Sequence, residues 1–291
     1  MIWGSVKLIL FWLGILKKKE KIDEEIGEDS DDIIINIPVA IDDFKEEEKE
    51  PIEVLIEESE KEQEGKEKPN PNKNNLIVFR NGHGLNTSGK EAPDKTKEYT
   101  LNKWITEKTI PMLERLGYEC VIANPYDYED PNPIKALNIV IGHINRITLK
   151  AREQGKKVIC IDLHCNAHQP NFPKLEFTPA SGTVSFFWKR TIKDENGNKI
   201  LQYSKEGEKL AIDIHEQMIK LTGLPDRAWS FNRGKAVGWN YMVLRKTICP
   251  AVTVECAFMT NSSDLEYLKS QEGQTTIAKA ITRGVDNYFN N

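Results

Sequence analysis

The sequence lacks three patterns that would each have narrowed its class at once. Its five cysteines are odd in number and form no C-x-x-C pair, so neither a disulfide framework nor a zinc ribbon is indicated. No H-E-x-x-H motif is present, which argues against peptidases that carry their metal ligands on one helix turn. No apolar run reaches the roughly 20 residues of a membrane-spanning helix, and mean hydropathy is −0.52. A polytopic membrane protein is excluded.

The N-terminal segment, residues 1–19, is predicted to be a hydrophobic helix. Ile2–Leu16 are almost wholly apolar and are followed by Lys17–Lys19. This order reverses that of a cleavable signal peptide, whose positive charge comes first. We therefore expect a membrane contact through residues 2–16, or else packing of this helix on the chain's own body or on a partner subunit.

The next segment, residues 20–74, is predicted to be an acidic, disordered linker. Residues 1–74 hold 21 Asp and Glu, 11 Lys and no Arg, whereas residues 75–291 hold 29 Lys and Arg against 24 Asp and Glu. Two apolar islands, Ile33–Ile37 and Ile52–Ile56, could instead add an edge strand to the body. The basic body suits an anionic target such as nucleic acid or a cell-wall polymer.

After Asn75, short apolar runs alternate with longer helical patterns, which indicates the α/β class. The predicted strands are Leu76–Phe79, Cys120–Ala123, Val158–Leu163, Val184–Trp188 and Ala251–Glu255. The predicted helices are Tyr99–Leu116, Pro133–Gln154, Ser204–Leu221, Ser262–Ser270 and Thr275–Phe289. We expect a three-layer domain with a mostly parallel mixed sheet flanked by helices. The turn residues 194–198 predict that Trp188–Tyr203 is a β-hairpin insertion.

Three of the predicted strands end in residues that can carry chemistry. The first runs into His83 between two glycines, the third into His164, and the last into Glu255. Functional groups of an α/β sheet gather where its strands end. A carboxylate at the end of an apolar strand is costly unless a cation meets it. Glu98, at the start of the first helix, could fold back towards His83, and two His with one Glu form a catalytic zinc set.

The body also resembles a known family, the zinc-dependent N-acetylmuramoyl-L-alanine amidases of the amidase 3 type. The matching stretches are NGHGLNTSGKEAPD with KEYTLN, VICIDLHCNA, SGTVSFF, VLRKTICPAVTVECAFMTNSSDLEYL and IAKAITRGVDNYF. They cover essentially all of residues 75–291, in the family's order. Within the family, the motif sequences NGHGLNTSGK and CPAVTVECAFMTN are most similar to those of bacteriophage lysis or virion-associated amidases.

Carried over by position, the resemblance implies that His83, Glu98 and His164 are the zinc ligands and that Glu255 is the catalytic glutamate. These are the four residues that the strand ends also indicate. Cys165 and Cys256 stand where the family more often has a small residue. The hairpin and the acidic segment lie outside the family pattern.

The resemblance implies a cell-wall hydrolase acting on the amide between N-acetylmuramic acid and L-alanine of peptidoglycan, with no nucleic-acid partner. Zinc would activate a water and polarise the carbonyl, while Glu255 takes the water proton and returns it to the departing amine. One alternative is a zinc carboxypeptidase-like peptidase, although His83 and Glu98 are far apart for that group. Another is a non-catalytic wall-binding or virion structural module. The presence of all four site residues argues against this alternative.

Location is the least determined property. A wall amidase acts outside the inner membrane, yet Lys17–Lys19 would hold the following chain on the cytoplasmic side. A phage lysis enzyme made in the cytoplasm of a bacterial host, or a virion component, satisfies both facts. The sequence does not indicate an oligomeric state.

Secondary candidates for substrate contact lie near the motifs: Asn166, His168, Ser181, Arg245 and Asn261. Turn formation, a salt bridge or a helix N-cap explains most of them equally well. His143 and His215 fall in helical patterns, and we expect them at the surface or at its boundary.

Overall fold

The computed structural model describes residues 71–85, 87, 90–123, 132–193, 199–229 and 235–290. All of them belong to one compact unit, residues 70–291. The predicted N-terminal helix, the apolar islands and the hairpin turn 194–198 lie outside the described residues. Among the helices that are described, none combines the length and apolar character needed to cross a membrane.

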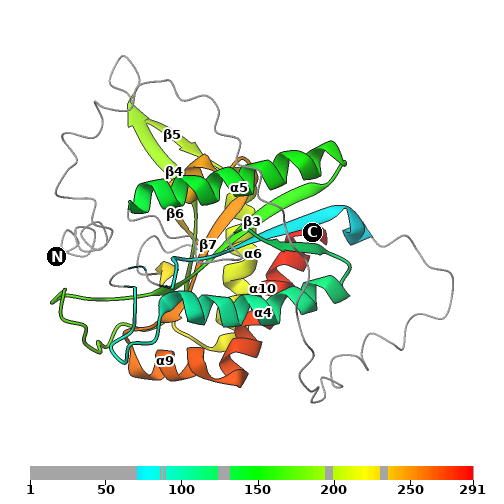
Figure 1. Ribbon diagram of the computed structural model, residues 1–291. Helices are drawn as coiled ribbons and strands as arrows, with labels where there is room; N and C mark the ends of the chain where they lie inside the picture. The colour runs from blue at the N-terminus through cyan, green and yellow to red at the C-terminus, as the bar shows by residue number, and fades with distance from the viewer. Residues whose placement is uncertain are drawn as a thin grey trace, which may run out of the picture. The chain divides into compact units, whose positions relative to one another are not determined.

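A seven-stranded mixed sheet forms the middle layer (Figure 1). Its strands are β1 (Asn75–Asn81), β2 (Glu119–Ile122), β3 (Lys157–Asn166), β4 (Val184–Lys193), β5 (Lys199–Tyr203), β6 (Val237–Trp239) and β7 (Ala251–Phe258). The order is β2-β1-β3-β7-β4-β5, with β6 also paired to β4. The neighbours β2, β1, β3 and β7 run parallel, and β4 runs antiparallel to β7. The mostly parallel mixed sheet that the sequence predicts is confirmed.

Helices cover both faces of this sheet, as Figure 1 shows. They are α4 (Glu98–Arg115), α5 (Pro133–Glu153), α6 (Lys205–Thr222), α8 (Met242–Lys246), α9 (Ser262–Lys269) and α10 (Gln271–Asn290). On one face, apolar residues of α5 and α8 share a core with alternate residues of β1 and β3, such as Leu76, Val78, Val158 and Cys160. On the other face, α10 packs between α4 and α6. The expected three layers are therefore present.

Local signals explain where the helices begin and end. The Asn132 side chain accepts from Ile134 N and Lys135 N, which caps α5 just before its first-turn proline. Ser204 caps α6 in the same way, and Gly223 ends that helix with a left-handed φ of 67°. The observed ends of α5 and α6 lie within one residue of the predicted boundaries.

The structure adds elements that the sequence pattern does not predict. Strand β6 and helix α8 are too short, at 3 and 5 residues, to show a period. A 3-10 helix, η2 (Pro71–Asn74), occupies the last four residues assigned to the linker, and Asn72 Nδ2 donates to Leu116 O at 2.9 Å. The hairpin insertion is present, with β4 and β5 paired antiparallel from Lys189↔Tyr203 to Lys193↔Lys199.

Candidate active site

The carboxyl ends of the central strands carry polar side chains in two rows across the sheet. In the first row, Arg80 of β1 pairs in register with Asp162 of β3, which pairs with Thr253 of β7. In the second row, two residues further on, His164 of β3 pairs with Glu255 of β7. Side chains two apart on a strand share one face of the sheet. Strand register alone therefore gathers a guanidinium, an imidazole and two carboxylates at this edge.

The three residues expected to bind a metal lie together at the same edge. His164 Nδ1 is 2.9 Å from Glu98 Oε1, and His83 Nε2 is 3.4 Å from Glu98 Oε2. The two imidazoles meet edge to face with centroids 4.9 Å apart. One ligand atom from each of the three residues lies within 4.8 Å of the other two. The Glu98 side chain is only 1% exposed.

Backbone contacts hold this set in place. His83 adopts a left-handed φ of 64°, which L side chains rarely do, and so turns the chain sharply after β1. Glu98 is the first residue of α4, and its Oε1 accepts from Cys165 N at 3.2 Å. Asn102, one turn later, donates from Nδ2 to Gly82 O at 3.2 Å. The start of α4 is thereby tied to the ends of both β1 and β3.

Gly82 leaves open the space that the His164 ring occupies. A Cβ at Gly82 would lie 2.4 to 2.6 Å from Cε1, Nδ1 and Nε2 of that imidazole. Its backbone cannot easily retreat, because Gly82 N donates to Leu163 O at 2.7 Å. The ring of one candidate ligand therefore packs directly on the backbone next to the other.

The Nε2 atom of His164 faces the buried carboxylate of Asp162. Asp162 Oδ1 is 3.3 Å from His164 Nε2 and forms an ion pair with Arg80, while Oδ2 accepts from Thr253 Oγ1 at 3.0 Å. Burial would raise the pKa of Asp162, but Arg80 and His164 outweigh it and bring it to about 2. A carboxylate behind an imidazole fixes the ring's orientation and leaves its other nitrogen for a ligand role.

The electrostatics of the two imidazoles differ. Burial, followed by the charge of Lys90, lowers the pKa of His83 well below its usual range, so this ring is neutral. Burial also acts to lower the pKa of His164, but Asp162 and Glu98 reverse that effect and raise it to about 10. A position that holds a proton so tightly between carboxylates attracts a cation.

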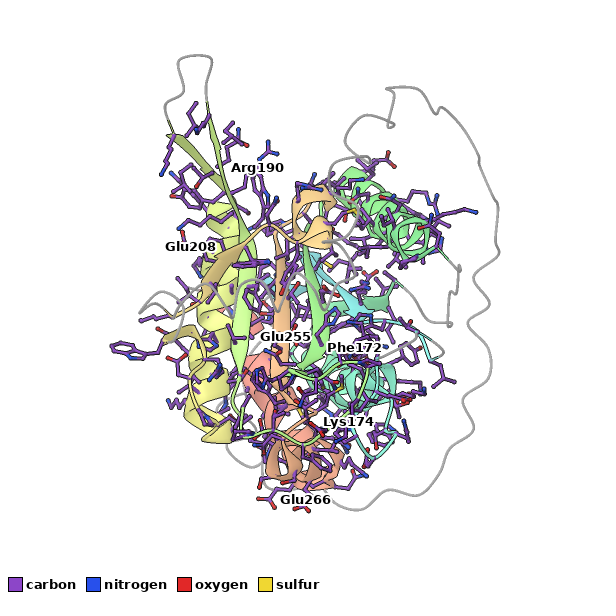
Figure 2. All side chains as sticks on the ribbon, turned by 90° about the vertical axis from the view of Figure 1, so that its left-hand side faces the viewer. Phe172, Lys174, Arg190, Glu208, Glu255 and Glu266 are labelled. Atoms are coloured by element: carbon purple, nitrogen blue, oxygen red, sulfur yellow. The ribbon has the colours of Figure 1, made fainter. Side chains whose placement is uncertain are left out.

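Glu255 lies near the end of β7, where its label stands in Figure 2, and the residue is half-buried. Its strand neighbours are His164 on β3 and Val184 on β4, and its Oε2 is buried with no hydrogen-bond partner among the described residues. Burial raises the pKa of Glu255 to about 7, with smaller contributions from the charged groups around it. A carboxyl group with such a pKa can take and return a proton near neutral pH.

The secondary candidates have structural partners. Asn261 caps α9 by accepting from Asp264 N at 3.1 Å, and Ser181 Oγ donates to the buried Asp264 at 2.6 Å. Asn166 Oδ1 accepts from Ala167 N at 2.8 Å. Arg245 Nη1 donates to Asn240 Oδ1 at 3.5 Å. These contacts account for the four residues without a substrate.

The three remaining histidines also lie apart from the metal set. His168 is half-buried, and its backbone N donates to Thr260 Oγ1 at 2.9 Å. His143 is half-buried against Ala123 O, at 3.2 Å. The expectation of a surface or boundary position is wrong for His215, which is 1% exposed because α6 turns it inward to Asp226 Oδ1 at 3.0 Å.

Sequence reasoning missed the supporting residues of the site. Arg80 and Asp162 sit within the motifs without a predicted role, and Gly82 is predicted there only as a residue that lets the chain turn at His83. Asp162 could have been found from the sequence, because an acidic residue inside an apolar strand needs a cation nearby. The same argument indicates Glu255. No sequence pattern indicates the role of Gly82, since that role depends on the His164 ring, which belongs to another strand.

An α/β fold with two imidazoles and two carboxylates at the carboxyl edge of its sheet defines a hydrolytic enzyme with a candidate metal centre. Residues 77–287 match the amidase 3 family, described as N-acetylmuramoyl-L-alanine amidase. The chain belongs to this family. Its function is hydrolysis of the amide between N-acetylmuramic acid and L-alanine in peptidoglycan.

Individual relatives are distant. The uncharacterised protein YqiI of Bacillus subtilis is 27% identical over 161 residues, which cover 53% of this chain and 74% of that protein. An uncharacterised cell wall amidase of Bacillus anthracis is 29% identical over 137 residues, 47% of this chain but only 22% of that protein. The solved amidase AmiC2 of Nostoc punctiforme superposes with a TM-score of 0.55 at 21% identity, covering 75% of this chain and 98% of that one. The last likeness confirms the fold.

Proposed function

We propose that the hydrolysis depends on zinc held by His83, Glu98 and His164, with Glu255 as the proton-transferring group. The observation that carries the proposal is the convergence of these four side chains, from four separate segments, at one edge of the sheet. Zinc favours nitrogen and carboxylate ligands, and catalytic sites keep a position open beside three of them.

The chemistry of the donor set fits this ion. Within the described residues, Glu98 Oε2 is buried and accepts no hydrogen bond, so one carboxylate oxygen is available to a cation. His83 is neutral, as a ligand must be, whereas His164, with its pKa raised to about 10, would release a proton on binding the metal. His164 directs Nδ1 towards Glu98, and Asp162 lies on the other side of its ring. Bound zinc would polarise the scissile carbonyl and lower the pKa of a water.

The chain's own residues then move the protons. Water adds its oxygen to the carbonyl carbon of the lactyl group, and the bond from that carbon to the L-alanine nitrogen breaks. Glu255 accepts one proton from the water and donates it to the departing nitrogen, leaving a lactyl carboxyl group and a free amine. The buried Asp162 keeps the His164 ring oriented throughout.

The test separates ligand from proton carrier. Purified protein should contain about one zinc per chain, and His83→Ala and His164→Ala should each lose it. Glu255→Gln should keep both zinc and fold but lose wall hydrolysis by roughly 10²-fold or more. Mass spectrometry of digested peptidoglycan should show new L-alanine amino termini. Undiminished zinc in both His variants would refute the ligand assignment, and full activity of Glu255→Gln would refute the role of Glu255.

We also propose that the chain serves as a bacteriophage lysis or virion-associated amidase, with residues 2–16 as a membrane contact. The motif phrasing and the apolar segment followed by Lys17–Lys19 support this placement. Fractionation of cells that express the full chain tests it. Recovery of the full chain and of residues 71–291 in identical fractions would contradict the membrane contact.

A further inference from the structure

A lysine enters the site from the loop that precedes α4. Glu98 N donates to Lys90 O at 3.0 Å, Glu91 and Lys97 form an antiparallel bridge, and Ala92 N donates to Thr96 O at 2.8 Å. These bonds fold residues 90–98 into a small antiparallel ladder. Lys90 is therefore held opposite Glu98, the proposed zinc ligand.

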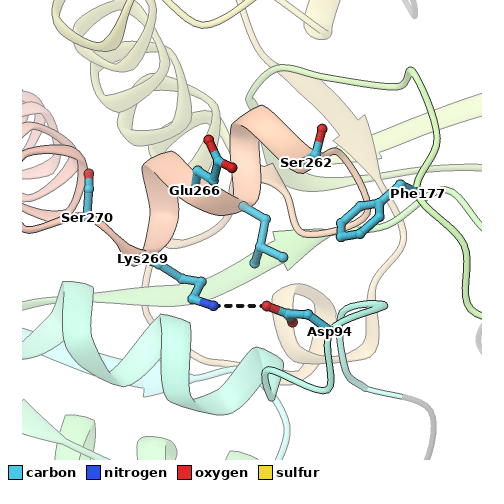
Figure 3. Close-up of a pocket in the computed structure, with 7 residues that line it drawn as sticks. Asp94, Phe177, Ser262, Glu266, Lys269 and Ser270 are labelled. Carbon is cyan, nitrogen blue, oxygen red and sulfur yellow. Dashed lines mark hydrogen bonds and ion pairs between the residues drawn. The ribbon is translucent and has the colours of Figure 1, made fainter.

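The far end of this ladder is tied down as well. Lys95 Nζ and Lys97 Nζ both contact the Glu91 carboxylate, at 3.0 and 2.6 Å. At the tip, Asp94 accepts from Lys269 of α9 at 2.9 Å, across the pocket of about 480 Å³ drawn in Figure 3. Exposed pairs contribute little singly. Together with the backbone ladder they define one conformation of the loop, so the backbone of Lys90 has a fixed position.

The Lys90 ammonium nitrogen is buried. Burial lowers the pKa of Lys90 to about 8, and the two carboxylates that oppose this shift are Glu98 and Glu255. The same ammonium acts on the pKa values of His83 and Glu255. Lys90 thus lies within electrostatic range of a proposed ligand and of the proton carrier.

We propose that Lys90 is a substrate-contacting residue, whose ammonium donates to the oxygen of the scissile carbonyl as negative charge develops on it. This inference rests on the proposed function. The reacting carbonyl must come between the metal ligands and Glu255. The ladder pairs Lys90 with Glu98, so the two side chains leave it on the same face, and the Lys90 ammonium is buried there. A donor aimed at developing charge in a site shielded from water contributes far more than it would in bulk water.

Steady-state kinetics on a soluble muramoyl-peptide substrate test the proposal in the full-length, zinc-loaded protein. Lys90→Met keeps the length of the side chain and removes its charge, and should lower kcat by roughly 10²-fold with little change in KM. Lys90→Gln should show a smaller loss, and Lys90→Arg should recover part of kcat. The matched control is Lys95→Met, from the same loop but with a side chain 71% exposed, which should behave as wild type.

The outcomes are separable. Unchanged kcat in Lys90→Met or Lys90→Gln would overturn the proposal, as would a loss confined to KM. Loss of zinc in the folded Lys90→Gln variant would show instead that Lys90 only positions Glu98. If wild type releases L-alanine amino termini and Glu255→Gln does not, the proposed function stands and the Lys90 variants judge this inference alone. If wild type releases none, the proposed function fails and this inference fails with it.

Discussion

Substituting Gly82 by alanine should misplace a candidate zinc ligand without touching its side chain. The added Cβ would lie 2.4 Å from His164 Cε1, 2.5 Å from Nδ1 and 2.6 Å from Nε2. Ordinary carbon contacts begin near 3.5 Å, so the imidazole and the backbone must separate by about 1 Å. The His164 ring cannot simply move away, because Glu98 contacts its Nδ1 and Asp162 its Nε2.

The magnitude follows from the tolerance of metal sites. Ligand distances in such sites are held within about 0.2 Å, so a shift of about 1 Å lies far outside the working range. Loss of a single supporting partner already costs about 10- to 100-fold in metal affinity, and the same loss, about 1.4 to 2.7 kcal/mol, is the smallest we expect here. Overpacking should also destabilise the fold by about 1 to 3 kcal/mol.

Zinc titration with a competing chelator measures the affinity, and thermal unfolding of the zinc-free protein measures the fold separately. Gly142→Ala on α5 is the matched control, because a Cβ there meets nothing within 4 Å. That variant should bind zinc as wild type does and gain up to about 1 kcal/mol of helix stability. Wild-type zinc affinity in Gly82→Ala would refute the steric argument.

The remaining predictions concern the support of the site, the pH dependence of stability and the front segment. Asp162→Asn leaves Arg80 buried without its partner, so it should lower the free energy of unfolding by about 3 to 5 kcal/mol and zinc affinity by about 10- to 100-fold; a change below 1 kcal/mol in urea unfolding would contradict this. Burial lowers the pKa of His215 despite Asp226, so the folded state binds fewer protons than the unfolded state below about pH 6.5. Stability should therefore fall as the pH drops through that value, and His215→Gln should reduce this slope in urea unfolding at pH 5 and 7; an equal slope would exclude His215 as the cause. Residues 71–291, freed from the acidic segment, should hydrolyse isolated walls and bind them more tightly than the full chain at low salt, an effect that salt screens; equal binding would remove the electrostatic part.

The sequence predicts most of the fold because its apolar runs are long enough to show a period. Predicted and observed helices agree within about one residue except at α10, which begins at Gln271 rather than Thr275. There, Ser270 Oγ accepts from Gly273 N, so a single residue ends α9 and caps the next helix. No periodicity can reveal a junction that short. Strand β3 likewise runs on to Asn166, through polar residues that an apolar run does not include.

The sequence also indicates the four residues of the candidate site, because His83, His164 and Glu255 each stand at the end of an apolar run and Glu98 begins a helix. Their supporting residues could not be found in the same way. Lys90 lies on a polar loop without a period, and Gly82 matters only for the volume it leaves empty. Such contributions arise from packing between segments, and only three-dimensional coordinates show them.

The register of β7 against β3 determines which residues can do chemistry at this edge. Because side chains alternate, a slip by one residue would exchange Glu255 for Cys256 beside His164 and turn the carboxylate to the opposite face of the sheet. Cys256 is fully buried on that face, so an ionised Glu255 there would carry a large desolvation cost. The row formed by Arg80, Asp162 and Thr253 disfavours such a slip, since the hydrogen bond from Thr253 Oγ1 to Asp162 forms in the observed register. The buried polar row beneath the site thus specifies the alignment that brings Glu255 beside the candidate metal ligand His164.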